Sequence, residues 1–153
     1  MPRPTGMPIG LRLADVARDV GRAFDQALAE HGGSRPLWMV LLALKSGAAA
    51  SQQQIADHIG IRGATLTHHL SGMEERGLVV RRREPGDRRT QVVRLTDEGE
   101  HLFVALAGAA REFDKRLRRG LKADDVAQLD ALLQRLHANA GVRGSLLPGD
   151  VAP

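Results

Sequence analysis

The sequence predicts a mainly α-helical fold with one small β-hairpin, and three observations lead to this prediction. Apolar residues recur at helical spacing along most of the 153 residues. Two runs rich in valine, "LVVRRR" and "TQVVRLT", flank the turn sequence "EPGD", as in a hairpin. The core has to rest on Leu, Val and Ala, because the chain has three Phe, one Trp and no Tyr; such a composition favours helix.

The first two expected helices differ in how much of their surface is apolar. From Leu13 to Leu28 the apolar residues follow intervals typical of an amphipathic helix, which we expect over about residues 11–30. "HGGS" ends this helix. A second helix is expected from near Pro36. Its segment "LWMVLLAL" is apolar on nearly all sides, so we expect it to be deeply buried.

Two shorter expected helices follow, joined by a tight turn. Ser51 and Gln54 form a capping-box pair at the start of "QQQIADHIG". The next helix is expected over about residues 62–76, and Gly77 suits a left-handed end. A helix, a tight turn and a helix describe a helix-turn-helix, and the hairpin directly after them describes a wing.

Two further helices are expected after the hairpin. Thr96 is a good N-cap for a helix that runs to about residue 119, and the last helix is expected over about residues 122–139. The first of these would have about 23 residues and a length of about 35 Å. Because its apolar positions continue along that whole length, we expect something beyond the winged domain to bury part of it.

The positive charge is concentrated in one segment. Between Arg62 and Arg94 there are eight basic and four acidic residues, whereas the rest of the chain has equal numbers of both. The whole net charge of +4 therefore lies in the helix-turn-helix and the hairpin. Such focusing favours a polyanion partner, although a solvated charged loop is the alternative.

The helix expected over residues 62–76 has two contrasting faces. At about 100° per residue, its large apolar side chains fall on the face expected to meet the core: Leu66, Leu70 and Met73. The opposite face carries small and polar residues: Ala64, Thr65, His68 and Gly72. A helix of this kind can lie in the major groove and contact base edges. The expected DNA contacts of this helix are Arg62, Gly63, Ala64, Thr65, Thr67 and His68.

The tip of the expected wing carries Asp87, Arg88 and Arg89. Arginine at a narrow tip suits the minor groove, where negative potential is concentrated. We expect Asp87 both to act as a turn residue after Pro-Gly and to hold a neighbouring arginine by a bidentate pair.

The stretch "GATLTHHLSGMEERGLVVRRREPGDRRTQVVRLTDEGEHL" resembles the winged-helix core of the MarR family of bacterial transcription regulators. The family's wing pattern maps onto Asp87, Arg89, Val93, Leu95, Thr96 and Gly99. Order and lengths agree over about residues 10–140. The resemblance implies a ligand-responsive repressor that binds a palindromic operator as a homodimer. Double-stranded DNA and a second copy of the chain are therefore the expected partners.

The resemblance also implies how the chain is divided. A DNA-binding lobe is expected between two dimerisation regions and two flexible ends: 1–10 flexible, 11–34 dimerisation, 35–96 winged helix-turn-helix, 97–140 dimerisation, 141–153 flexible. A small aromatic or phenolic effector would bind in a cleft between the lobe and the dimerisation helices. Phe24 and Trp38 are the aromatic candidates for lining that cleft, although large aromatic residues more often belong to the core.

Other functions find less support in the residues. No nucleotide-binding or hydrolase motif occurs, and Ser71 fits a solvent-facing helix position better than a nucleophile, so no enzyme and no cofactor are expected. Adjacent His68 and His69 point about 100° apart and do not suit one metal ion. A zinc-responsive regulator with ligands from several helices stays an alternative, as does an architectural DNA-binding protein without sequence preference.

The cysteine count, the first ten residues and the length of the apolar runs predict the compartment of the protein. With no cysteine there is no disulfide and no thiol-based sensing. "MPRPTGMPIG" lacks a signal-peptide pattern, and no apolar run reaches the roughly 18 residues of a membrane span. The cytoplasm is the expected compartment, with no membrane partner.

Overall fold

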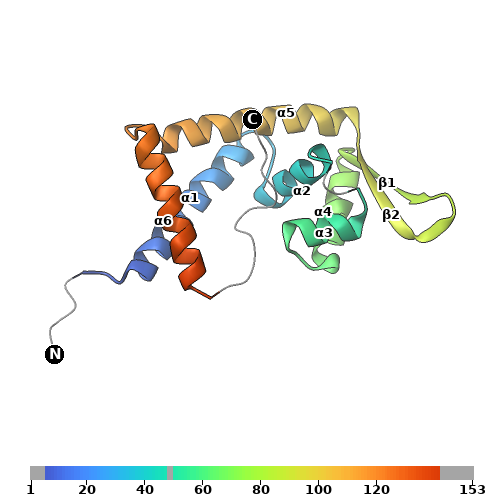
Figure 1. Ribbon diagram of the computed structural model, residues 1–153. Helices are drawn as coiled ribbons and strands as arrows, with labels where there is room; N and C mark the ends of the chain where they lie inside the picture. Colours follow the sequence, from blue (N-terminus) through green and yellow to red (C-terminus); the bar gives the residue numbers. More distant parts are fainter. Residues whose placement is uncertain (1–5, 48–49, 142–153) are drawn as a thin grey trace.

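The computed structural model describes residues 6–47 and 50–141. In these ranges the chain forms six helices and one antiparallel hairpin (Figure 1). The helices are α1 Ile9–Ala29, α2 Arg35–Lys45, α3 Gln52–Ile59, α4 Gly63–Glu75, α5 Asp97–Leu117 and α6 Ala123–Asn139. The strands are β1 Val79–Glu84 and β2 Asp87–Leu95. The mainly α fold with a small β-hairpin is thus confirmed. The chain ends expected to be flexible fall largely outside the described residues.

The long helix α5 connects the two ends of the molecule. Figure 1 shows it running along the top, with the hairpin below one end and α6 below the other. Helices α2, α3 and α4 pack together beside the hairpin, and α1 packs against α5 and α2. The helix-turn-helix and its wing therefore form one lobe, and α1, α6 and the far part of α5 extend away from it.

The helix ends lie where the sequence placed them, to within two residues. Ser51 and Gln54 form both hydrogen bonds of the expected capping box at the start of α3. Gly60 and Gly77 adopt left-handed conformations, with φ of 72° and 69°, directly after α3 and just after α4. Thr96 caps α5 by accepting a hydrogen bond from the Gly99 N–H at 3.1 Å. These local features fix the lengths of the short helices.

The hairpin is regular at its base and irregular near its tip. β1 and β2 pair from Val79↔Leu95 to Arg83↔Gln91, after which Glu84 pairs with Asp87. This shift leaves residues 88–90 outside the regular ladder, so the backbone that carries two arginines bulges there.

The core joins the lobe to α5. Side chains from α1, α2, α3, α4, the hairpin and α5 form one buried cluster, whose fully buried members include Leu28, Leu41, Ile55, Leu66, Leu70 and Leu106. At one point two backbones nearly touch: a Cβ at Gly99 would lie 2.1 Å from the carbonyl oxygen of Leu78. Only glycine allows α5 to begin so close to the start of the wing.

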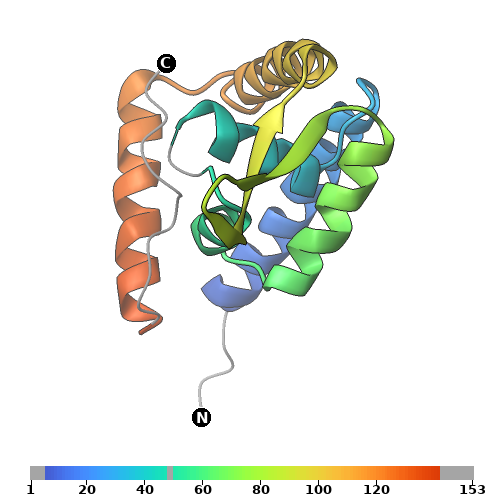
Figure 2. The ribbon, with the colours of Figure 1, turned by 90° about the vertical axis from the view of Figure 1, so that its right-hand side faces the viewer.

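Part of the helical surface stays uncovered. α6 contains no buried residue, and Figure 2 shows it standing apart from the other helices. Leu129 and Leu132 in α6 are 49% and 45% exposed, and Ile9 and Val16 in α1 are 62% and 55% exposed. Exposed apolar side chains thus gather on the parts of α1 and α6 away from the lobe.

Candidate nucleic-acid interface

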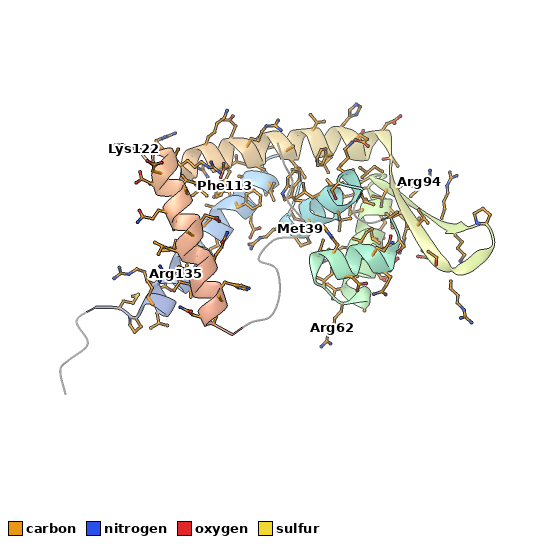
Figure 3. All side chains as sticks on the ribbon, in the orientation of Figure 1. Met39, Arg62, Arg94, Phe113, Lys122 and Arg135 are labelled. Carbon is orange, nitrogen blue, oxygen red and sulfur yellow. The ribbon has the colours of Figure 1, made fainter. Side chains whose placement is uncertain are left out.

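Helix α4 has the two faces that the sequence predicts. Leu66, Leu70 and Met73 are buried at 0%, 0% and 2% exposure. The residues expected to contact DNA are all exposed: Arg62, Gly63, Ala64, Thr65, Thr67 and His68. α4 therefore presents a small, polar surface at its N-terminal half, and Figure 3 shows Arg62 projecting into solvent beside it.

The hydroxyl of Thr67 is already engaged within the protein. It accepts a hydrogen bond from Gln52 Nε2 at 2.6 Å and donates one to the Gly63 carbonyl at 2.9 Å. Gln52 is not among the residues that the sequence predicts to contact DNA. Its position as the first residue of α3 offers no signal, because the contact with α4 spans fifteen positions along the chain.

The eight arginines between Arg62 and Arg94 differ in their surroundings. Arg76 donates to the Gly32 carbonyl at 2.7 Å, and Arg81 is held by Glu74. Arg76, although exposed, thus joins the end of α4 to the loop after α1, and Arg81 joins α4 to the wing. The remaining arginines whose side chains are described are exposed: Arg62, Arg82, Arg83, Arg89 and Arg94. The side chains of Asp87 and Arg88 lie outside the described part, so the expected pair between Asp87 and an arginine stays a prediction.

The wing is fixed to α4 by a compact polar contact. The carboxylate of Glu74 accepts hydrogen bonds from the backbone N–H of Arg81 at 3.0 Å and from its Nε at 2.8 Å. Arg81 Nη2 also donates to the hydroxyl of Ser71 at 3.2 Å. Hydrogen bonding from Arg81 lowers the pKa of Glu74. The solvent-facing position expected for Ser71 is therefore wrong: its side chain is half-buried beneath the wing.

A groove separates the wing from the start of α3. It has a volume of about 390 Å³ and is lined by Ser51, Gln52, Gln53, Arg83, Arg89, Thr90 and Gln91. The strand and the helix are joined beside it, because Ala50 accepts a hydrogen bond from the Val93 N–H at 2.9 Å. Gln52 thus lines this groove together with the wing residues Arg83 and Arg89, and it also contacts Thr67 of α4.

A second, more apolar cavity lies on the inner side of the lobe. It measures about 450 Å³ and is lined by Asp25, Arg35, Pro36, Met39, Ile59, Ile61 and His69. Arg35 donates from Nε to Asp25 at 2.9 Å, and this contact lowers the pKa of Asp25. The cavity therefore combines an apolar wall with one ion pair and one imidazole.

The two aromatic residues expected near such a cavity do not line it. Trp38 is 8% exposed and stacks on Phe103, with 5.5 Å between ring centroids. Phe24 packs against Phe113 at 5.2 Å. Both rings join α1 or α2 to α5 and belong to the packing between helices.

The histidines show no arrangement for metal binding. The rings of His68 and His69 are 6.0 Å apart between centroids. Within residues 6–47 and 50–141, no three His, Asp or Glu side chains cluster in a way that could hold a metal ion.

No helix within residues 6–47 and 50–141 is long and apolar enough to cross a membrane.

Comparisons with known proteins agree with this geometry. The model of the MarR family matches residues 31–90. An uncharacterized HTH-type transcriptional regulator, YdgJ of Bacillus subtilis (strain 168), is 29% identical over 128 residues, which cover 84% of this chain and 76% of that protein.

Two solved structures share the fold. CouR from Rhodococcus jostii RHA1, bound to p-coumaroyl-CoA, has 29% identity and a TM-score of 0.69, with 84% of this chain and 90% of that chain covered. A mutant MarR from E. coli complexed with operator DNA has 23% identity and a TM-score of 0.75, with 85% and 94% covered. Its winged helix-turn-helix, its wing pattern and these relatives make the chain similar to the DNA-binding transcriptional regulators of the MarR family, whose model its residues 31–90 match.

Proposed function

We propose that this regulator binds a palindromic operator as a homodimer and represses transcription until a small effector releases it. The observation that carries the proposal is the surface formed by α4 and the wing. Its apolar residues are buried, its outer residues are small or polar, and exposed arginines flank it. Such a helix can enter the major groove while wing arginines contact phosphates or the minor groove.

The DNA contacts proposed here follow that surface. Residues 35–96 form the DNA-binding lobe, with α4 as the recognition helix. The proposed contact residues are Arg62, Gly63, Ala64, Thr65, His68, Asp87, Arg88 and Arg89; Thr67 is left out of this set because its hydroxyl bonds to Gln52 and to the Gly63 carbonyl. The likeness of the fold to a MarR structure solved with operator DNA supports this arrangement.

The homodimer is supported by the uncovered apolar residues. Leu129 and Leu132 of α6 and Ile9 and Val16 of α1 are between 45% and 62% exposed in the single chain. A second copy related by two-fold symmetry would cover them, with residues 11–34 and 97–140 forming the interface. Recognition helices set about 34 Å apart then meet successive major grooves on one side of the DNA.

The effector site proposed here is the apolar cavity beside α2. Its volume suits a small organic molecule. Met39 and the two isoleucines provide apolar contact, and Arg35 and His69 provide polar groups for an aromatic or phenolic ligand. CouR, solved with p-coumaroyl-CoA, supports this class. Because His69 belongs to α4, a ligand there can bias the position of the recognition helix.

Footprinting upstream of the protein's own gene tests the main proposal. We expect one protected palindrome, bound about a thousandfold or more tightly than random duplex at near-physiological salt. Equal affinity for both would favour an architectural role. Deleting the gene should raise transcription from the protected promoter, and light scattering should give twice the mass of one chain.

The effector proposal has its own test. p-Coumarate and p-coumaroyl-CoA are the first probes, with release of operator DNA as the measurement. Met39→Trp would fill the cavity, so the variant should bind operator normally and no longer respond to the ligand that releases the wild type. A variant that responds as before would place the effector elsewhere.

A further inference from the structure

The first residue of α3 connects three parts of the DNA-binding lobe. Its neighbours Ala50 and Ser51 pair with β2: the Val93 N–H donates to the Ala50 carbonyl, and Ser51 forms a bridge with Val92. From this junction the Gln52 side chain crosses to α4 and donates to Thr67 at 2.6 Å. Gln52 therefore joins the recognition helix to the base of the wing.

The second half of this link secures the start of α4. The hydroxyl proton of Thr67 is used in the hydrogen bond to the Gly63 carbonyl, one turn earlier in the helix. A hydroxyl has a single proton, so Thr67 cannot also donate to a base edge without breaking this bond. The geometry therefore favours a role for Thr67 as the acceptor of the hydrogen bond from Gln52 over a role as a residue that contacts DNA bases.

A contribution to stability does not by itself explain why glutamine occupies position 52. Gln52 Oε1 is buried and has no hydrogen-bond partner among the residues that the structure describes. Buried polar atoms in folded proteins are nearly always paired, and one left unpaired keeps its desolvation cost. An apolar side chain of the same length would avoid that cost. The presence of glutamine here is therefore better explained by the position it gives α4.

We propose that Gln52 is a positioning residue for sequence discrimination: through Thr67 it holds the recognition helix at the angle to the wing that operator binding needs. The inference rests on the proposed operator binding. The proposal predicts that sequence discrimination and stability respond differently to one change. Removing the Gln52 amide should lower the ratio of affinities for operator and random DNA, while the stability of the protein stays unchanged or rises.

Four variants of the full-length protein test this role. Gln52→Met and Thr67→Val remove the two polar groups while nearly keeping volume, the double variant removes both, and Thr67→Ser keeps the hydroxyl. The measurements are the melting temperature and the ratio of affinities for the footprinted operator and random duplex at fixed salt. We expect both single variants to lose about tenfold in that ratio. The double variant should lose no more than either one, because the two residues act as a unit.

The outcomes separate the possibilities. Thr67→Ser with a near wild-type ratio, and Gln52→Met with an unchanged or higher melting temperature, support the proposal. A Gln52→Met variant that discriminates between operator and random DNA like the wild type overturns the proposal. If only Thr67→Val lowers the affinity ratio, Thr67 instead contacts the DNA bases directly. If the wild type shows no preference for any sequence, the proposed function itself has failed.

Discussion

Arg81 in the wing and Glu74 in α4, the proposed recognition helix, share three hydrogen bonds, one from the backbone N–H of Arg81 and two from its guanidinium. The side chains are only 20% and 33% exposed. The contact therefore fixes the first strand of the wing against α4 at one defined point. Any movement of the wing relative to the recognition helix has to break it.

Glu74→Gln should destabilise the protein in a pH-dependent way. The variant loses charge-assisted hydrogen bonds, and partial exposure limits the cost to about 1–2 kcal/mol at neutral pH. Arg81 holds the pKa of Glu74 below its usual 4.5. The wild-type advantage is thus complete above that value and declines as the pH falls through the lower folded pKa. Urea unfolding across this range measures it. The exposed neighbour Glu75→Gln is the control, and an equal loss at every pH would contradict the assignment.

Arg89→Ala should weaken DNA binding broadly and flatten its salt dependence. The side chain is exposed at the groove between the wing and α3. Removing one phosphate contact lowers the slope of log affinity against log salt by about 1. Titrations of operator and random duplex at several salt concentrations give both slopes. Arg111→Ala on α5, which changes the net charge equally, should leave the slope unaltered. An unchanged slope for Arg89→Ala would remove this residue from the interface.

His68→Ala or Thr65→Ala should alter sequence preference more than general affinity. Both side chains are exposed on the outer face of α4. A lost base contact costs about 1–3 kcal/mol on the operator and little on random DNA. Selection from randomised duplexes shows which base positions lose definition. His101→Ala, exposed on α5, should return the wild-type motif. Parallel losses on operator and random DNA would mean that these residues contact only the backbone.

Gly99→Ala should damage the joint between the wing and α5. The added methyl would lie 2.1 Å from the Leu78 carbonyl oxygen and 3.1 Å from Leu95 Cδ2, so backbone has to shift. A cost of about 1–3 kcal/mol is expected. Gly108→Ala in the same helix meets nothing within 4 Å and should stabilise by up to about 1 kcal/mol. Urea unfolding of the two variants gives opposite signs if the close approach is real.

The helices and their ends were predictable because local residues determine them. Ser51 with Gln54, and Gly77 after α4, act within a few positions of the helix ends that they define. The buried face of α4 likewise follows from helical spacing. Charge counting was less informative, since it does not show which arginines have partners within the protein. Only the folded chain shows that Arg76 bonds to the Gly32 carbonyl and that Arg81 pairs with Glu74.

The candidate site depends on contacts that sequence spacing does not encode. Gln52 meets Thr67 across the helix-turn-helix, and the apolar cavity draws residues from α1, α2, the end of α3 and α4. Phe24 and Trp38 were the aromatic candidates for a cavity lining, although large aromatic rings more often belong to the core. Their stacking on Phe113 and Phe103 depends on how α5 crosses α1 and α2. No pattern within either helix specifies that crossing.

In the proposed homodimer, the isolation of α6 in the single chain makes protein concentration a determinant of folding. A helix of 17 residues without a buried side chain has little packing energy to hold it, and isolated helices of this length are marginal in water. Its order then depends on whatever covers its leucines. For a helix ordered by self-association, the melting temperature rises with concentration. In the proposed homodimer, newly made chains at low abundance would have a frayed C-terminal helix, and each would complete its fold only on meeting a second copy.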